Sequence, residues 1–200
     1  MAIEILNDAE FYDRYEIIEG EKFMSPSANI NHNRIVANLT ILIGGYAHTH
    51  RLGYVFTDNL DVHFPDSKNT FNPDFIFVSL ANGKIVTDNK DKTIYGVPDM
   101  VVEIFSRSTM RRDLTVKKDI YERNGVKEYW MIDPWRESVE VYLLRDGKYY
   151  FDDIYQNYSE EELNELTDAE RAEIKSEIPV AVLDGFKVKI RNIFGLYFES

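Results

Sequence analysis

The pattern of apolar and polar positions predicts an N-terminal hairpin followed by a long amphipathic helix. Residues 11–24 hold two short apolar runs around a Glu19-Gly20 turn, and glycine supplies the backbone freedom that a tight hairpin turn needs. Residues 31–50 carry apolar side chains at helical spacing, namely Ile35, Leu39, Leu42, Ile43 and Tyr46. Either Asn29 or Asn31 is suited to cap this helix.

The rest of the chain alternates between strand-like and helix-like patterns. Strands are predicted over residues 53–56, 60–64, 71–80, 97–105, 127–134, 139–144, 148–151 and 186–190. The near-continuous apolar run at 97–105 predicts a strand that is buried on both faces. Residues 109–124 predict a helix that ends at Gly125, residues 81–93 a polar loop, and residues 159–178 an acidic helical insertion. We therefore expect one α/β domain over residues 1–200, with a mixed sheet.

Composition places the chain among soluble globular proteins. Of its 200 residues 44% are hydrophobic and 29% are charged, and there is no cysteine to form a disulfide, a zinc–thiolate site or a thiol nucleophile. No run approaches the ~18 apolar residues that a membrane-spanning helix needs. The first residues lack the pattern of a secretory signal, so we expect a cytoplasmic protein without a membrane partner.

The net charge of −12 argues against a general polyanion-binding protein, because phosphate neutralisation needs lysine and arginine. The charge is unevenly distributed along the chain, however. Residues 159–178 alone hold eight acidic and two basic residues. Basic residues gather instead between positions 107 and 123: Arg107, Arg111, Arg112, Lys117, Lys118 and Arg123. The acidity therefore weakens a nucleic-acid function without excluding it.

Two carboxylates on oily strands are the strongest chemical signal in the sequence. Glu103 lies within the apolar run 97–105, and Asp74 precedes the apolar run 75–78. Lone buried carboxylates are costly, so they are usually paired, protonated or bound to a metal. Lys117 follows on the next predicted helix, where Asp113, Lys117 and Tyr121 share one face. Two acids and a lysine of this kind suggest a divalent-metal site for phosphodiester chemistry.

Each of these residues also has an ordinary structural interpretation. Asp74 follows Pro73 and can simply begin a strand and cap local amides. Glu103 can belong to a buried salt bridge without catalysis. Lys117 can be a solvated helix lysine, paired on the surface with Asp113. It is the combination of the three that favours a functional site.

The chain resembles the Uma-type restriction endonucleases of the PD-(D/E)XK nuclease superfamily. The resemblance rests on residues 15–21 (YEIIEGE) and 24–27 (MSPS), on His32, on Pro73-Asp74 and Pro98-Asp99, and on residues 102–106 (VEIFS). It continues through Asp113, Lys117 and Tyr121, and its most recognisable part is residues 125–134 (GVKEYWMIDP). In all it covers residues 11–198.

This resemblance implies a restriction-endonuclease-like core, a mixed β-sheet flanked by helices, with a Mg²⁺- or Mn²⁺-dependent site. Asp74 matches the first acid of the family and Glu103 the second, with the backbone carbonyl of Ile104 as a further metal ligand. The superfamily usually has a lysine two residues after the second acid, where this chain has Phe105. Lys117 on the following helix matches the lysine of the family pattern instead.

The same resemblance implies an early glutamate in the site. Glu21 is the nearer match and Glu16 the alternative. His32 opens the first helix, where it can contact the site or a phosphate, or serve as a capping or surface residue. Asp113 can orient Lys117 or face the same cavity.

The leading hypothesis is a divalent-metal-dependent endonuclease that hydrolyses phosphodiester bonds in DNA, acting as a homodimer. Its catalytic residues would be Asp74, Glu103, Lys117, Glu21 and Asp113. Two other hypotheses remain open. One is a nuclease fold that only binds or regulates, favoured by the charge of −12. The other is a structural homodimer joined through the aromatic-rich C-terminal half.

Overall fold

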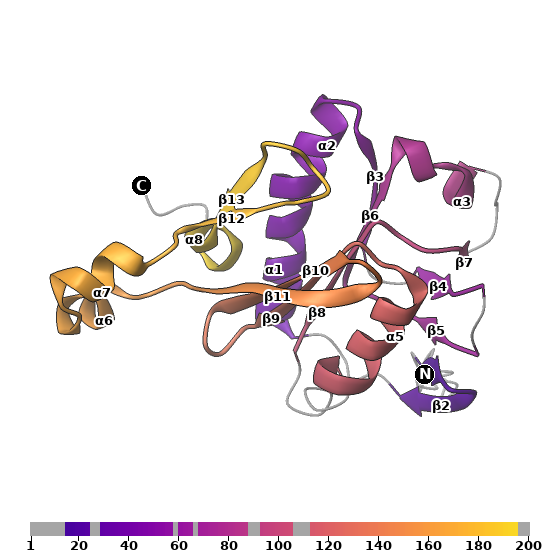
Figure 1. The fold of residues 1–200 in the computed structure, drawn as a ribbon, viewed down its shortest axis with the longest axis horizontal. Coiled ribbons are helices and arrows are strands. Elements are labelled where there is room, and N and C mark those ends of the chain that lie inside the picture. The colour runs from indigo at the N-terminus through magenta and orange to yellow at the C-terminus, as the bar shows by residue number, and fades with distance from the viewer. Residues whose placement is uncertain are drawn as a thin grey trace, which may run out of the picture.

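The computed structural model describes residues 15–24, 29–57, 60–65, 68–87, 93–105 and 113–195, without the side chains of residues 113 and 114. Within these residues three β-sheets pack with helices, and the larger two sheets each contain parallel and antiparallel pairs (Figure 1). The mixed α/β fold expected from the sequence is therefore confirmed.

A six-stranded sheet forms the centre of the described structure. Its order is β11-β10-β9-β8-β6-β3, and only the β8–β9 pair is parallel. Its strands are β3 (Gly53–Thr57), β6 (Phe75–Ser79), β8 (Met100–Ile104), β9 (Glu128–Asp133), β10 (Ser138–Arg145) and β11 (Lys148–Gln156). Every residue of β8 and β9 is buried, as the apolar run at 97–105 predicted for β8.

The N-terminal hairpin belongs to a second sheet of order β2-β1-β5-β4-β7. Its strands are β1 (Tyr15–Ile18), β2 (Glu21–Met24), β4 (Asp61–His63), β5 (Thr70–Phe71) and β7 (Thr93–Tyr95). Both turn residues have positive φ, 51° at Glu19 and 87° at Gly20, which is the backbone of a tight two-residue hairpin turn. The described part of the predicted hairpin is confirmed, and residues 11–14 lie outside the described residues.

Helices cover both faces of the central sheet. On one face lies a continuous helix made of α1 (Ile30–Leu39), a π-helical turn η1 (Thr40–Gly44) and α2 (Gly45–Thr49), as predicted for residues 31–50. The Asn29 side chain caps it by accepting from the backbone N–H of His32. Ile35 and Leu39 of α1 pack with Phe75 and Phe77 of β6.

The opposite face of the sheet is covered by η3 (Asp113–Lys117) and α5 (Lys118–Asn124). Ile120 and Tyr121 of α5 pack with Ile76 and Val78, which alternate with the β6 residues on the other face. The helix ends at Gly125 in the left-handed conformation (φ 88°), as predicted. Residues 109–112 of the predicted helix lie outside the described residues.

The acidic segment is not one helix, as the sequence suggested, but two. Helices α6 (Glu160–Glu165) and α7 (Asp168–Glu173) are separated by Leu166-Thr167, and Ser159 and Thr167 each form a capping box with the glutamate three residues later. Because Thr167 starts a new helix, α6 has to end before it. A small hairpin, β12 (Glu177–Pro179) with β13 (Lys187–Lys189), and α8 (Ile190–Phe194) follow. Figure 1 shows α6 and α7 at the opposite end of the molecule from α5.

Two other sequence expectations are wrong in detail. Residues 71–80 do not form one strand, because the chain leaves β5 after Phe71 and enters the central sheet only at Phe75. Pro73 explains the break, since proline has no N–H to donate to a sheet. Residues 81–93 are not simply a loop. They include the end of the 3₁₀ turn η2 (Leu80–Asn82), helix α3 (Lys84–Thr87) and the start of β7, with residues 88–92 outside the described residues.

Candidate active site

A buried lysine between two buried glutamates is the central feature of the site. The Nζ atom of Lys117 lies 2.7 Å from Oε1 of Glu16 and 2.9 Å from Oε2 of Glu103. Each of the three residues is only 3% exposed. Charged side chains are almost never buried to this extent unless they are paired, and here the three side chains pair with one another.

Three separate elements supply these side chains. Glu103 lies near the end of β8, on the face that α5 covers. Lys117 is the last residue of η3, and Glu16 comes from β1, where Glu16 and Ile18 are buried while Tyr15 is exposed. The alternation of β1 thus turns Glu16 inward, and the hairpin positions it against Lys117. The backbone N–H of Asn72 also donates to Oε1 of Glu16, at 3.3 Å.

Tyr121 holds the other oxygen of Glu103. Its hydroxyl donates to Oε1 of Glu103 at 2.6 Å, and its ring is fully buried against Phe71 and Phe64. Burial, followed by the nearby charge of Glu103, raises the pKa of Tyr121 well above its usual value. The phenol therefore stays protonated and remains a hydrogen-bond donor to this carboxylate.

Asp74 lies immediately before β6, at the point where the chain enters the central sheet. Its Oδ1 contacts Nε2 of His32 at 2.9 Å, and its Oδ2 accepts the backbone N–H of Ile104 at 2.6 Å. In the antiparallel β6–β8 pair Phe75 is opposite Val102, so extending the register by one residue places Asp74 opposite Glu103. The Asp74 carboxylate contacts His32 of α1, whereas the Glu103 carboxylate contacts Lys117 and Tyr121 of η3 and α5. The two residues are therefore adjacent in the register, and their carboxylates have different partners.

The donor set at this sheet edge has the chemistry of a hard-cation site. Asp74 and Glu103 offer carboxylate oxygens, and the hydrogen bond from the N–H of Ile104 holds the backbone of Ile104 beside Asp74. Oxygen ligands of this kind suit Mg²⁺ and Mn²⁺. Within the described part of the chain no three acidic or histidine side chains already stand at metal-binding spacing. The residues fit a divalent cation by donor type, and their side chains would have to reorient to bind it.

Comparison with known proteins decides the family. The model of the Uma2 family, described as "Putative restriction endonuclease", matches residues 7–177. The chain belongs to this family. An uncharacterized protein of Synechocystis is 28% identical over 151 residues, which cover 70% of this chain and 81% of that protein. Among solved structures, a putative nuclease of the DUF820 family from Anabaena variabilis is similar with a TM-score of 0.70 and 18% identity, covering 92% of this chain and 90% of that one. At that identity the likeness shows a shared fold.

In this Uma2 chain Glu103 and Lys117 are paired, and Asp74 binds the backbone N–H of Ile104, the residue after Glu103. The ordinary alternative for Lys117, a solvated helix lysine, is wrong, because the side chain is buried and paired. Phe105, which occupies the usual lysine position of the superfamily, is buried in the apolar cluster beneath α5. The side chain of Asp113 lies outside the described residues.

Of the two early glutamates, the structure brings Glu16 and not Glu21 to Lys117. Glu21 is exposed on β2, whereas Glu16 is buried and bonded to Lys117. The alternation of inward and outward side chains along β1 could have indicated this choice. Glu16 lies on the same inward face as Ile18, whereas Glu21 follows the turn. His32 contacts Asp74, so the interpretation that it touches the site fits better than a surface role. The sequence did not indicate a role for the Tyr121 hydroxyl.

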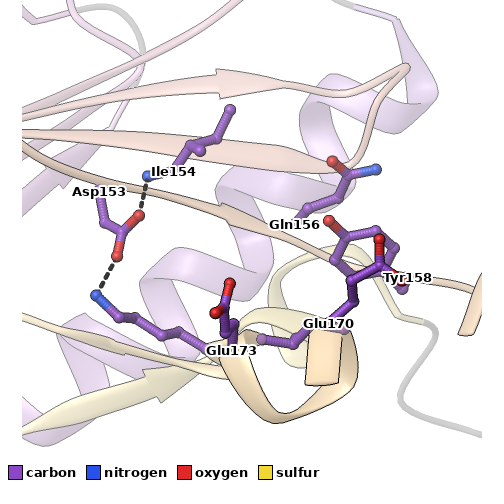
Figure 2. A pocket seen from close by; sticks show the side chains of 8 residues that line it. Asp153, Ile154, Gln156, Tyr158, Glu170 and Glu173 are labelled. Carbon is purple, nitrogen blue, oxygen red and sulfur yellow. Dashed lines mark hydrogen bonds and ion pairs between the residues drawn. The ribbon is translucent and has the colours of Figure 1, made fainter. Parts of the chain in front are cut away.

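A different hollow lies beneath the acidic helices. It has a volume of about 220 Å³ and lies between the end of β11 and α7 (Figure 2). Asp153, Glu170 and Glu173 line it, and Asp153 accepts from the backbone N–H of Ile154 and from the ammonium of Lys175. With three acids against one lysine, its charge is unsuited to a phosphate group. Among the helices of the described residues none is long and apolar enough to cross a membrane.

Proposed function

We propose that this protein is a divalent-metal-dependent endonuclease that hydrolyses phosphodiester bonds in DNA. The observation that carries the proposal is the buried Lys117–Glu103 pair, with Asp74 bonded to the N–H of the residue that follows Glu103. The family, described as "Putative restriction endonuclease", supports the reaction class. The site supports the role of each residue.

The charge of the site supports a divalent cation. Glu16, Glu103 and Asp74 are three carboxyl groups, and Lys117 is the one ammonium that the described residues place among them. With all of them ionised the formal charge is −2, unless His32 is protonated. A divalent cation would offset part of the negative charge that these carboxyl groups contribute.

Asp74, Glu103 and the carbonyl of Ile104 would hold Mg²⁺ or Mn²⁺. Such an ion supplies Lewis-acid stabilisation of a phosphate oxygen and a bound water of lowered pKa. Lys117 places a compact positive charge where the phosphate would develop negative charge. Tyr121 fixes the orientation of Glu103, and Glu16 fixes that of Lys117, since each bonds its partner at less than 3 Å.

A homodimer acting in the cytoplasm would allow cleavage of both strands of a duplex, each subunit cutting one strand. The alternative function, a nuclease fold that only binds nucleic acid, is favoured by the net charge of −12. That alternative requires nucleic-acid binding that does not depend on metal and is not followed by cleavage.

The experiment is cleavage of supercoiled plasmid DNA by the purified protein in Mg²⁺, in Mn²⁺ and in a chelator. We expect nicked and linear products with either ion and none with the chelator. Asp74→Asn should remove the activity, and Glu140→Gln, on β10, is the matched control that should retain it. Metal-independent binding without cleavage by the wild type would favour the alternative function.

A further inference from the structure

All four carboxylate oxygens of the two proposed metal ligands already have a polar partner. In Asp74 the partners are His32 Nε2 and the N–H of Ile104. In Glu103 they are the Tyr121 hydroxyl and the Lys117 ammonium. Of the donors to Glu103, the ammonium carries a full positive charge. The Lys117 ammonium is therefore the cation that Oε2 of Glu103 binds in this structure.

A divalent cation and this ammonium cannot share Glu103 at low cost. Mg²⁺–oxygen bonds are about 2.0–2.1 Å long. The Lys117 nitrogen is 2.9 Å from the same carboxylate, so the two positive centres would stand a few ångströms apart in a buried site. Like charges repel strongly there because little water screens them. Binding of the ion should thus displace Lys117 from Glu103.

Glu16 offers Lys117 a second place. It lies 2.7 Å from the ammonium, and the backbone N–H of Asn72 helps to fix its carboxylate independently of Lys117. When Lys117 leaves Glu103, its charge therefore does not have to remain buried and unpaired, a situation that would be costly. The phenyl ring of Phe71, 5.7 Å from Nζ, also faces the ammonium.

We propose that Lys117 is an internal competitor for the cation site at Glu103, and that Glu16 is the counter-ion that retains it when a divalent cation binds. This inference rests on the cation site of the proposed function. It adds an order of events. Without the ion, Lys117 is paired with both Glu103 and Glu16, and binding of the ion would release the Lys117 ammonium from Glu103. Only then can Lys117 turn toward a substrate phosphate, so metal loading regulates access to the lysine.

The test is a calorimetric Mn²⁺ titration of the wild type and of the double variant Glu16→Gln/Lys117→Met. The double variant removes one negative and one positive charge, so the net charge is unchanged while the competitor and its counter-ion are both lost. We expect it to bind Mn²⁺ about tenfold more tightly than the wild type. The matched control is Glu19→Gln/Arg123→Met, which removes an exposed ion pair between the same hairpin and α5 and should bind as the wild type does.

The outcomes separate this inference from the proposed function. If the wild type binds Mn²⁺ and the double variant binds no more tightly, the competition is refuted and the cation site stands. If neither binds, both proposals fail. Binding by the double variant alone would support the competition in its strongest form.

A second measurement on the wild type does not depend on the variant folding. Acetylation of lysines is followed by mass spectrometry with and without saturating Mg²⁺. The labelling rate of Lys117 should rise with Mg²⁺, while that of the adjacent Lys118 stays constant. An unchanged rate for Lys117 would overturn the proposal.

Discussion

The ammonium of Lys117 lies 2.9 Å from Oε2 of Glu103, so the end of η3 and the central strand β8 are joined by a buried ion pair. The superfamily pattern places the lysine two residues after the acid on the same strand, where this chain has Phe105. Here a lysine 14 residues later reaches the same carboxylate from the covering helix. The ion pair therefore depends on how η3 and α5 pack on the sheet, and changes in that packing should affect the site.

The identity of the early glutamate leads to the first prediction. Glu16→Gln should lower the rate of DNA cleavage by about 10- to 100-fold, because Lys117 loses the partner that orients it. Glu21→Gln is the matched control and should leave the rate within about twofold, since Glu21 is exposed on β2. Cleavage rates at saturating Mg²⁺ provide the measurement. A larger loss in Glu21→Gln than in Glu16→Gln would reverse the assignment.

Tyr121 is predicted to be a positioning residue for Glu103. Tyr121→Phe keeps the buried ring and removes only the hydroxyl, which leaves Oε1 of Glu103 without this donor. We expect a loss of about 1–3 kcal/mol in the free energy of unfolding, measured by urea denaturation. If Tyr121 has a purely structural role, only the free energy of unfolding should change. A positioning role also lowers kcat while KM is unchanged, and an unaltered kcat would contradict it.

Asp99 lies at the other end of β8 from Glu103 and provides a contrasting case. This buried carboxylate accepts from the backbone N–H of Ser79, from Asn82 and from the ammonium of Lys127. Burial alone would raise the pKa of Asp99, but the hydrogen bonds from Lys127 and Ser79 outweigh it and hold the pKa below its usual value. Asp99→Asn should cost about 1–3 kcal/mol of stability and leave Mn²⁺ affinity unchanged. A change in affinity would show that the two ends of the strand are coupled.

The buried Glu128 should make the stability of the protein depend on pH, independently of the candidate active site. It is fully buried on β9 and accepts from Trp130 Nε1 and from the N–H of Val182. Burial raises its pKa from 4.5 to about 7. Because the folded pKa is the higher one, the folded protein retains a proton that the unfolded chain has released. The stabilising contribution is complete below the unfolded value and is lost as the pH rises through about 7.

The size of this effect follows from the two pKa values. The difference between the two pKa values corresponds to a loss of about 3 kcal/mol in the free energy of unfolding. This loss occurs as the pH rises from below 4.5 to above 7. Urea midpoints of the wild type should therefore fall between pH 5 and pH 8 by more than those of Glu128→Gln, which does not titrate. Parallel pH profiles for the two proteins would show that Glu128 does not cause the change.

Local patterns were sufficient to predict most of the fold. The hairpin around Glu19-Gly20 and the helix end at Gly125 are each specified by neighbouring residues, and the structure has them as predicted. For the cap of the first long helix the sequence left Asn29 and Asn31 open, and the structure has Asn29. The errors arose where one local signal was outweighed by another. Pro73 interrupts an apolar run, and Thr167 begins a second helix within an acidic one.

The candidate site was predictable only in part, because its parts lie far apart in sequence. The sequence indicated Asp74, Glu103 and Lys117 as buried or unusual charges. It could not show that β1 packs against η3, since that contact depends on the pairing of β1 with β5 in the second sheet. This contact selects Glu16 over Glu21. The partners of Asp74, His32 and the N–H of Ile104, likewise come from α1 and β8.

The most direct test of the central claim, that the Glu103 cluster is a divalent-cation site, is a calorimetric Mn²⁺ titration of the wild type, Glu103→Gln and Glu21→Gln. It requires no knowledge of the substrate, and melting curves confirm that each protein is folded. We predict saturable binding in the wild type and in Glu21→Gln, and its loss in Glu103→Gln. Equal binding in all three proteins, or none in the wild type, would contradict the claim.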